Sequence, residues 1–300
     1  MALAGLAVPT PTLFDIEGAF DEDRNRRYHA GLVAAGVDHL FPLGSLGEFP
    51  SVEEEERDRL LDIVQGTLRG ATDLWVGVGA PSTRCAVRWA QHARDREAAA
   101  LLAVPPYYLR PTAAAIADYY RAIARATGIP LLAYNIPAKV GYALTPELVH
   151  ALAREGTLVG IKDTSGSLES VRGFLQGAPA GFAVLPGDDV LAGASIAAGA
   201  TGAVMGLANI APNLGKALVR AALDGRADEV ARHQAVVESL AHVVAQGPFP
   251  STGKYLARHL RGAPDGYRAP YGPLTDDEER AVIVGLTPVR AVLDPYLQEG

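Results

Sequence analysis

Short apolar runs alternate with amphipathic segments along this 300-residue chain, at a spacing of about 25 to 35 residues. Most of the runs are apolar at every position, as parallel strands buried on both faces are. Eight such runs are expected to form strands, at residues 5–12, 37–43, 74–79, 99–105, 130–135, 158–163, 183–187 and 202–206. The segments between them are expected to be helices, so the sequence predicts eight strand–helix units and a (β/α)₈ barrel.

Two of the expected helices carry start signals. Thr145-Pro146-Glu147 supplies a capping threonine, a proline at the first helical position and an early acid. Ser51-Val52-Glu53-Glu54 is typical of a capping box. A doubly wound sheet is the main alternative fold, but no Gly-x-Gly-x-x-Gly follows the first expected strand.

The strand pattern stops near residue 211. Helices are expected beyond it at residues 211–223, 227–244, 251–260 and 275–297. The first of them completes the eighth unit of the barrel. The chain is therefore predicted to consist of a barrel catalytic domain, residues 1–224, and a C-terminal helical extension packed on it, residues 225–300.

Charge and cysteine content exclude several classes of protein. The net charge of −7, without a basic cluster, argues against a nucleic-acid partner. The single cysteine, Cys85, allows no internal disulfide and suits a reducing cytosol; it lies in a helical stretch, so a structural thiol is expected. No apolar run approaches the ~20 residues that cross a bilayer, and residues 1–6 lack the features of a signal peptide. We expect a soluble, cytoplasmic protein with no membrane partner.

Lys162 ends the sixth expected strand, although lysine is rare here. Only four lysines occur among the 27 lysine and arginine residues. An amine can lose its proton and attack a carbonyl, which a guanidinium does not do. Lys162 is thus a candidate nucleophile, and the alternative is a lysine that reaches the strand end and pairs with Asp163.

Other polar residues follow the expected strands, at the barrel end where active sites lie. Ser45 stands between Gly44 and Gly47 after the second strand, and Tyr134 ends the fifth. A lysine and a tyrosine on adjacent strands, with this serine, have the parts for imine chemistry, in which the phenol moves protons. The glycine-framed turn could direct backbone N–H groups at a carboxylate.

These motifs together resemble the dihydrodipicolinate synthase/N-acetylneuraminate lyase family. The resemblance is carried by Gly-Ser-x-Gly-Glu at 44–48, Tyr-Asn-Ile-Pro at 134–137 and Gly-Ile-Lys-Asp-Thr-Ser-Gly at 160–166. Tyr-Tyr-Leu-Arg-Pro at 107–111 and Gly-Ala-Thr-Gly-Ala-Val at 199–204 also fit, so it covers nearly the whole chain. It implies a (β/α)₈ barrel with a C-terminal helical appendage and a class I aldolase of pyruvate and 2-keto acids, without metal or organic cofactor.

The resemblance also implies residue roles. Lys162 would form an imine with pyruvate, in an interior that favours the neutral amine by desolvation, and Tyr134 would donate and accept protons. Ser45 would link Tyr134 to a second tyrosine, Tyr108, which in many members reaches across from a neighbouring subunit of a homotetramer built from dimers. Backbone N–H groups of Ser45 and Leu46 would hold the carboxylate. Further substrate-binding positions would be Gly44, Lys139, Gly187 and Val204.

Several of these residues have simpler interpretations. Tyr107 and Tyr108 could pack an interface. Glu48 is expected to order its turn. The pair Asp188-Asp189 is expected to cap the following helix, and Asn135 to satisfy buried backbone groups.

Two departures from the family pattern bear on the substrate. Synthases of the lysine pathway have a Thr-Thr pair where this chain has Ser45-Leu46, and an arginine where it has Lys139, which offers a point charge but no bidentate fork. The first expectation is therefore a pyruvate-forming aldolase of a 2-keto-3-deoxy sugar acid. The alternatives are 4-hydroxy-tetrahydrodipicolinate synthase, which condenses pyruvate with the aldehyde aspartate semialdehyde, a keto-deoxy-sugar-acid dehydratase, and a keto-acid-binding regulatory barrel that is not an enzyme.

Overall fold

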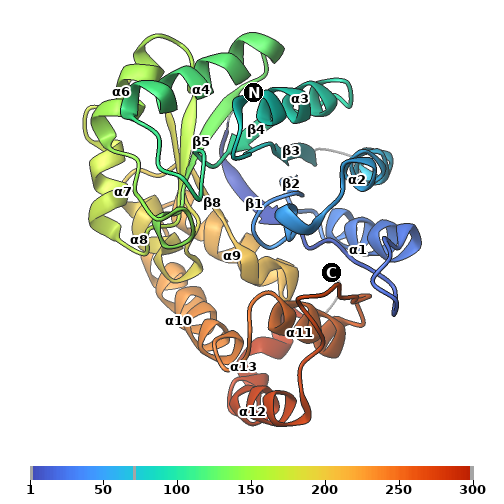
Figure 1. Cartoon of the computed structure of the whole chain (residues 1–300). Coiled ribbons are helices and arrows are strands. Elements are labelled where there is room, and N and C mark those ends of the chain that lie inside the picture. The colour runs from blue at the N-terminus through green and yellow to red at the C-terminus, as the bar shows by residue number, and fades with distance from the viewer. Residues whose placement is uncertain (1–2, 70–71, 298–300) are drawn as a thin grey trace.

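The computed structural model describes residues 3–69 and 72–297 and contains a barrel of parallel strands surrounded by helices (Figure 1). The strands are β1 (Gly5–Pro9), β2 (His39–Phe41), β3 (Asp73–Gly77), β4 (Ala100–Ala103), β5 (Leu131–Asn135), β6 (Gly160–Asp163), β7 (Ala183–Pro186) and β8 (Gly202–Val204). β1 pairs with both β2 and β8. On the other side of β8, the Thr201 amide donates to the Val184 carbonyl of β7 at 3.0 Å, which nearly closes the ring. The predicted (β/α)₈ barrel is confirmed.

All eight predicted strands form, and each is shorter than predicted. Their residues are almost all buried, in agreement with continuously apolar runs covered on both faces. The residues lost are those at the strand ends, where the chain leaves the sheet and enters the loops. The polar groups of the candidate site lie in these end regions.

Helices cover the outside of the barrel. They are α1 (Glu22–Ala34), α2 (Glu54–Thr67), α3 (Thr83–Arg94), α4 (Ala113–Thr127), the short α5 (Pro137–Val140), α6 (Pro146–Arg154), α7 (Leu168–Leu175), α8 (Ala192–Ala197) and α9 (Pro212–Leu223). Each buries one stripe: on α4 the buried set includes Ile116, Tyr119, Tyr120 and Ile123, at the three- and four-residue spacing of a helix face. Cys85 lies in α3, as predicted, and is half-buried.

One helix start was predicted correctly and one was misplaced. Thr145 caps α6 by accepting from the Leu148 amide, with Pro146 at the first helical position. The start predicted at Ser51 is wrong, because Ser51 ends a 3₁₀ turn, η1 (Phe49–Ser51), and α2 begins after Glu53. The Glu56 carboxylate accepts from the Glu53 amide at 3.0 Å, so the capping box lies two residues later than predicted.

The C-terminal segment, residues 225–297, contains α10 (Ala227–Val244), α11 (Ser251–Arg261), α12 (Asp276–Leu286) and α13 (Arg290–Leu293). Figure 1 shows these orange and red helices gathered on one side of the barrel, where α10 packs against α9 and α11 against the 3₁₀ turn η3 (Gly206–Asn209) that follows β8. The single helix predicted over 275–297 is wrong. It breaks between α12 and α13 at Pro288, which has no N–H to continue the ladder.

The predicted division into residues 1–224 and 225–300 stays a prediction, and its terminal residues 1–2 and 298–300 lie outside the described ranges. Among the helices of the described ranges, none combines the length and the apolar character that a membrane crossing requires.

Candidate active site

Lys162 and Tyr134 are neighbours across two adjacent strands. They are register partners of β6 and β5, so their side chains point to the same side of the sheet. Both side chains are buried, each 4% exposed. Lys162 Nζ lies 4.0 Å from the centre of the Tyr134 ring and 5.1 Å from that of Phe41 on β2. The amine is thus held inside the barrel against two aromatic rings.

The carboxylate of Asp163 is occupied by other partners. It accepts from Asn135 Nδ2 at 2.7 Å and from Ser165 Oγ at 2.8 Å. Asn135 Oδ1 in turn accepts from the Leu144 amide at 2.9 Å, so Asn135 satisfies a buried backbone group as expected. Successive residues of a strand point to opposite faces, which separates Asp163 from Lys162. The structure therefore does not support the alternative in which these two residues pair.

Ser45 stands beside Tyr134. Its Oγ lies 3.4 Å from Tyr134 Oη. The turn that carries Ser45 is closed by two backbone hydrogen bonds, from the Glu48 amide to the Ser45 carbonyl at 3.2 Å and from the Phe49 amide to the Gly44 carbonyl at 3.4 Å. These bonds use the carbonyls of Gly44 and Ser45 and not the amides of Ser45 and Leu46.

The surroundings of Tyr134 change the pKa of its phenol in a direction that suits proton transfer. Burial by itself raises the pKa of a phenol, but the Lys162 cation and hydrogen bonding with Ser45, Lys162 and Thr164 together outweigh it. The pKa of Tyr134 is therefore lower than that of an ordinary tyrosine. A phenol of lowered pKa next to an amine is suited to accept a proton from it and to return one later.

The other expected substrate-binding residues differ in how close they lie to Lys162 and in how far they are buried. Gly187 follows β7 and lies against Lys162, because a Cβ there would be 2.5 Å from Lys162 Cε. Val204 is buried at the end of β8, and the half-buried Leu46 follows Ser45 in the turn. Lys139 lies on α5, exposed, with its Nζ 5.0 Å from the centre of the Phe249 ring.

Tyr108 does not join the buried cluster within one chain. Its side chain is 94% exposed, and its φ of 73° is unusual for a residue with a bulky side chain. Tyr107 is the tyrosine that lies near the site: it is half-buried and packs edge-to-face on Phe49, with ring centres 5.9 Å apart. Sequence alone did not distinguish the two orientations.

A cavity of about 210 Å³ opens beside Ser45. Its lining is mainly apolar and aromatic, with Lys139 as the cation among the lining residues that the structure describes. It is lined by Ser45, Glu48, Phe49, Pro50, Val104, Tyr107, Ile136, Lys139, Val140, Phe249, Pro250 and Tyr271. The last three come from the C-terminal segment, so the extension takes part in shaping the mouth of the barrel.

Sequence reasoning missed Asp189 as a site residue. Asp189 follows β7, and its carboxylate accepts from the Gly206 and Leu207 amides at 3.1 and 3.0 Å, which caps η3 after β8. Burial raises its pKa to about 6, against those two hydrogen bonds and the nearby Lys162 cation. Asp188 accepts from the Val190 amide at 3.1 Å and so caps the turn directly after β7, as expected for the pair. The Asp188-Asp189 pair in the sequence did not indicate that the Asp189 side chain bonds the turn that follows β8.

Lys254 was missed as well. It lies on α11, is 2% exposed, and its Nζ lies 2.5 Å from Oε1 of Glu48 in the Ser45 turn. The rarity of lysine was the available signal, but the pattern of an amphipathic helix could not indicate a partner so distant in the sequence. Across the described ranges, no three His, Cys, Asp or Glu side chains are grouped as metal ligands would be.

A (β/α)₈ barrel with its buried polar centre at the carboxyl ends of the strands defines a barrel enzyme. The sequence model of the dihydrodipicolinate synthetase family matches residues 2–287. An uncharacterized DapA-like lyase of Halobacterium salinarum is 34% identical over 94% of this chain and 92% of its own length. A 4-hydroxy-tetrahydrodipicolinate synthase of Methanothrix thermoacetophila is also 34% identical, over 91% of this chain and 92% of its own.

Two solved structures are similar over the whole barrel and the C-terminal helices. YagE of E. coli K12, a protein of the dihydrodipicolinic acid synthase family in complex with pyruvate, has a TM-score of 0.91 and 28% identity over 97% of this chain and 99% of its own. The dihydrodipicolinate synthase of Acinetobacter baumannii, complexed with pyruvate, has a TM-score of 0.91 and 26% identity over 96% and 99% of the two chains. The chain belongs to the dihydrodipicolinate synthetase family, and it is an enzyme of the pyruvate-dependent class I aldolase type.

Proposed function

We propose that Lys162 is the imine-forming lysine of this enzyme and that pyruvate is the carbonyl compound it binds. The observation that carries the proposal is the register of β5 and β6, which sets a buried amine beside a phenol of lowered pKa. Pyruvate is bound by two solved relatives of similar fold. A neutral lysine amine attacks a ketone carbon, and an adjacent acid–base group supplies the proton transfers that the attack requires.

The reaction is proposed to run in four balanced steps. Lys162 Nζ adds to C2 of pyruvate, and loss of water gives the protonated imine. The imine loses a proton from its methyl carbon to give an enamine. The enamine carbon adds to an aldehyde, whose oxygen takes up a proton, and hydrolysis of the new imine releases the 2-keto acid and regenerates the amine. Cleavage is the reverse sequence. Tyr134, in contact with Ser45, accepts and donates the protons.

The carboxylate of pyruvate is proposed to lie on the Ser45 turn. The amides of Ser45 and Leu46 are not used by the hydrogen bonds that close this turn, and successive backbone N–H groups form an anion-binding concavity. Gly44, Gly187 and Val204 are proposed to line the same space. Gly187 leaves room for the Lys162 side chain, which a larger residue would displace.

For the aldehyde partner, the cavity beside Ser45 favours a 2-keto-3-deoxy sugar acid over aspartate semialdehyde. Lys139 can pair with the carboxylate of aspartate semialdehyde or donate hydrogen bonds to the hydroxyl groups of a sugar acid. Aspartate semialdehyde also carries an ammonium group, but the carboxylate among the lining residues, that of Glu48, is already paired with Lys254 and buried. The hydroxyl groups of Ser45, Tyr107 and Tyr271 offer hydrogen bonds to a sugar acid instead. The named relatives support the synthase activity as the second candidate.

Trapping of the imine is the first test. The protein is mixed with pyruvate and sodium borohydride, and its intact mass is measured beside Lys162→Ala and Lys162→Arg variants. We expect a reduced pyruvate adduct in the wild type alone, because a guanidinium keeps the charge and loses the nucleophile. An adduct that persists in both variants would place the reactive amine elsewhere. Pyruvate binding without any adduct would favour a keto-acid-binding regulatory barrel.

Turnover with a panel of substrates separates the remaining candidates. Pyruvate release from 2-keto-3-deoxy sugar acids is compared with condensation of pyruvate with aspartate semialdehyde, and water loss from a keto-deoxy sugar acid is followed in parallel. We expect the first to have the highest kcat/KM. A higher kcat/KM with aspartate semialdehyde would assign the synthase activity, and water loss without carbon–carbon cleavage would assign the dehydratase.

The assembly is proposed from the family resemblance and the location from the cysteine content. We infer a homotetramer built from two dimers, in which Tyr108 of one subunit reaches the site of its neighbour. The exposure of Tyr108 and of Leu109, 76% exposed, supports this arrangement, because large apolar side chains are usually covered in an assembled protein. A cytoplasmic location is inferred from the single cysteine.

A further inference from the structure

Lys254 is a cation that the C-terminal segment inserts into the buried part of the molecule. From α11 its Nζ donates to the Thr12 carbonyl at 2.8 Å and to the Gly266 carbonyl at 2.7 Å, and lies 2.5 Å from Glu48 Oε1. The side chains of Lys254 and Glu48 are each 1% exposed. Two carbonyls and the Glu48 carboxylate surround the ammonium group, so its charge is compensated although it is out of water.

Glu48, three residues after Ser45, has an unfavourable backbone conformation. Its φ is 52°, in the left-handed region, which is unfavourable for a residue with a side chain. Its amide donates to the Ser45 carbonyl and so closes the turn. Such a conformation persists when the surroundings fix it, and here the fixing contact is the ion pair with Lys254.

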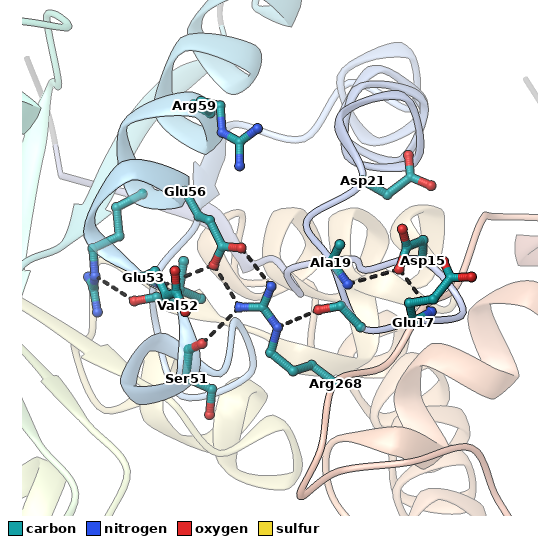
Figure 2. Close-up of polar contacts among 12 residues, drawn as sticks. Asp15, Glu17, Ala19, Asp21, Ser51, Val52, Glu53, Glu56, Arg59 and Arg268 are labelled. Carbon is teal, nitrogen blue, oxygen red and sulfur yellow. Dashed lines mark hydrogen bonds and ion pairs between the residues drawn. The ribbon is translucent and has the colours of Figure 1, made fainter.

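A second cation from the same segment, Arg268, holds this loop at Ser51. Arg268 donates to the Ser51 carbonyl at 3.1 Å, to the Gly18 carbonyl at 2.6 Å, and through two nitrogens to the Glu56 carboxylate at 2.6 Å each. Figure 2 shows Arg268 between Ser51 and Glu56 on one side and the loop that follows β1 on the other. Two positions of residues 45–51, Glu48 and Ser51, are therefore attached to the C-terminal segment.

We propose that Lys254 and Glu48 are positioning residues for the proton relay. The ion pair holds the Ser45 turn so that Ser45 stays within hydrogen-bond distance of Tyr134, which makes the C-terminal segment part of the catalytic apparatus. The contact between Ser45 and Tyr134, at 3.4 Å, is close to the outer limit of a hydrogen bond, so a small displacement of the turn breaks it. The inference rests on the proposed imine chemistry for its kinetic consequence, but its structural consequence is measurable separately.

A double-mutant cycle tests whether Glu48 acts through Ser45. Glu48→Gln keeps the size of the side chain and removes the charge, and it is preferred to Lys254→Met, which leaves a buried carboxylate unpaired and endangers folding. The rate of imine formation is followed by trapping with borohydride at intervals after pyruvate is added. We expect Glu48→Gln to slow it about tenfold at saturating pyruvate, because misplacement of the turn changes the reacting geometry.

The double variant with Ser45→Ala shows whether Glu48 acts through Ser45. If Glu48 acts by placing Ser45, the double variant Ser45→Ala/Glu48→Gln has the same rate as Ser45→Ala alone. If the two losses multiply, Glu48 acts independently of Ser45 and the proposal is overturned. Thr275→Ala is the matched control: it removes the cap of α12 in the same segment, far from the turn, and should lower stability without changing the rate.

A second measurement needs no turnover. Tyr134 is flanked by Lys162 and Ser45, and both lower its pKa. Loss of the Ser45 contact therefore raises the pH at which this phenol ionises, read as ultraviolet absorbance and assigned by its disappearance in Tyr134→Phe. We expect the same upward shift in Glu48→Gln and Ser45→Ala, and none in Thr275→Ala. If no pyruvate adduct forms in the wild type but the shift occurs, the proposed function fails and the positioning role stands. Lowered stability of Glu48→Gln without either change would leave only a structural pair.

Discussion

Gly187 occupies a position that has no room for a side chain. A Cβ there would lie 2.5 Å from Lys162 Cε and 2.1 Å from Thr164 Oγ1. We predict that Gly187→Ala displaces the lysine and slows trapping of the pyruvate adduct by about tenfold or more, with a stability loss of about 1–3 kcal/mol from overpacking. Borohydride trapping and urea unfolding measure the two effects.

The control for this substitution is Gly66→Ala. Gly66 is exposed in α2, and nothing lies within 4 Å of the position that its Cβ would occupy. This variant should keep the trapping rate, and its stability should stay equal or rise slightly, because alanine is the better helix former. A normal trapping rate in Gly187→Ala would show that Lys162 has another conformation from which it reacts.

Asp189 gives the stability of the protein a pH dependence of its own. Burial raises its folded-state pKa to about 6, well above the ~3.9 of a free aspartate. Between these two values the folded state holds the proton more tightly than the unfolded state, so this group's contribution is present below about pH 4 and is lost as the pH rises through about 6.

The substitution Asp189→Asn isolates that contribution. Asparagine does not ionise in this range, and its one carbonyl oxygen can accept from one of the two amides that now bond separate carboxylate oxygens; the loss of the other bond does not depend on pH. Relative to the wild type, the variant's free energy of unfolding should increase by on the order of 2 kcal/mol between about pH 4 and pH 7. Urea unfolding at several pH values measures it. Parallel pH curves for the two proteins would mean that Asp189 is ionised at low pH in the folded state.

The individual side chains of the site were predictable where they stand at strand ends. Lys162, Tyr134 and Ser45 each follow an apolar run, and parallel strands bring such positions to one end of a barrel. Lys254 was not predictable, because its partners Thr12 and Glu48 belong to loops far away in the sequence. A helix pattern specifies which face is buried and not which distant charge that face meets.

At the scale of elements, the cap of α6 offers a clean test of local sequence signals. Thr145 accepts from the Leu148 amide, and α6 lies on the outside of the barrel. Thr145→Ala should lower the free energy of unfolding by about 1 kcal/mol, since one helix-terminal N–H loses its acceptor. Urea unfolding measures the loss, and Thr145→Ser should restore most of it. An equal loss in both variants would assign the effect to the threonine methyl group instead.

The strands were predicted better than the helix ends, because strands and helix ends depend on different sequence signals. A strand covered on both faces is expected to be apolar throughout, and this holds for β4 and β7. The region 275–297 has a helical pattern on both sides of Pro288, and the pattern alone does not show that the missing N–H ends one helix and starts another. The predicted start at Ser51 failed similarly, since the early acidic residues of α2 follow closely on the 3₁₀ turn that ends at Ser51.

At the scale of the whole molecule, the exposure of Tyr108 is the observation that supports the proposed assembly. Its side chain is 94% exposed in the isolated chain, whereas Ser45 and Tyr134 lie in the barrel. The family resemblance assigns Tyr108 to the relay, and exposure of this degree is compatible with that role when the side chain enters a neighbouring site. Sequence alone could identify the Tyr-Tyr pair but not its direction, because an interface leaves no periodic pattern in a loop.

Subunit mixing tests this arrangement. In a hybrid of Lys162→Ala and Tyr108→Ala subunits, the site built on the intact Lys162 receives Tyr108 from the other subunit, so one complete site forms. Each variant alone should be nearly inactive. After the two are unfolded together and refolded, random pairing should return about a quarter of the wild-type activity, because half of the dimers are hybrids with one working site in two.

A different result is expected if Tyr108 does not enter the site of the neighbouring subunit. If Tyr108 acts within its own subunit, or serves only to pack an interface, the hybrid contains no site with both residues working together. Mixing then adds nothing to the activities of the separate variants. Co-refolding of Lys162→Ala with Tyr134→Phe is the matched control, because both of those residues belong to one barrel, on adjacent strands, and no exchange of subunits can reunite them. Restoration in the Tyr108 mixture and its absence in the Tyr134 mixture would together establish a site shared between subunits.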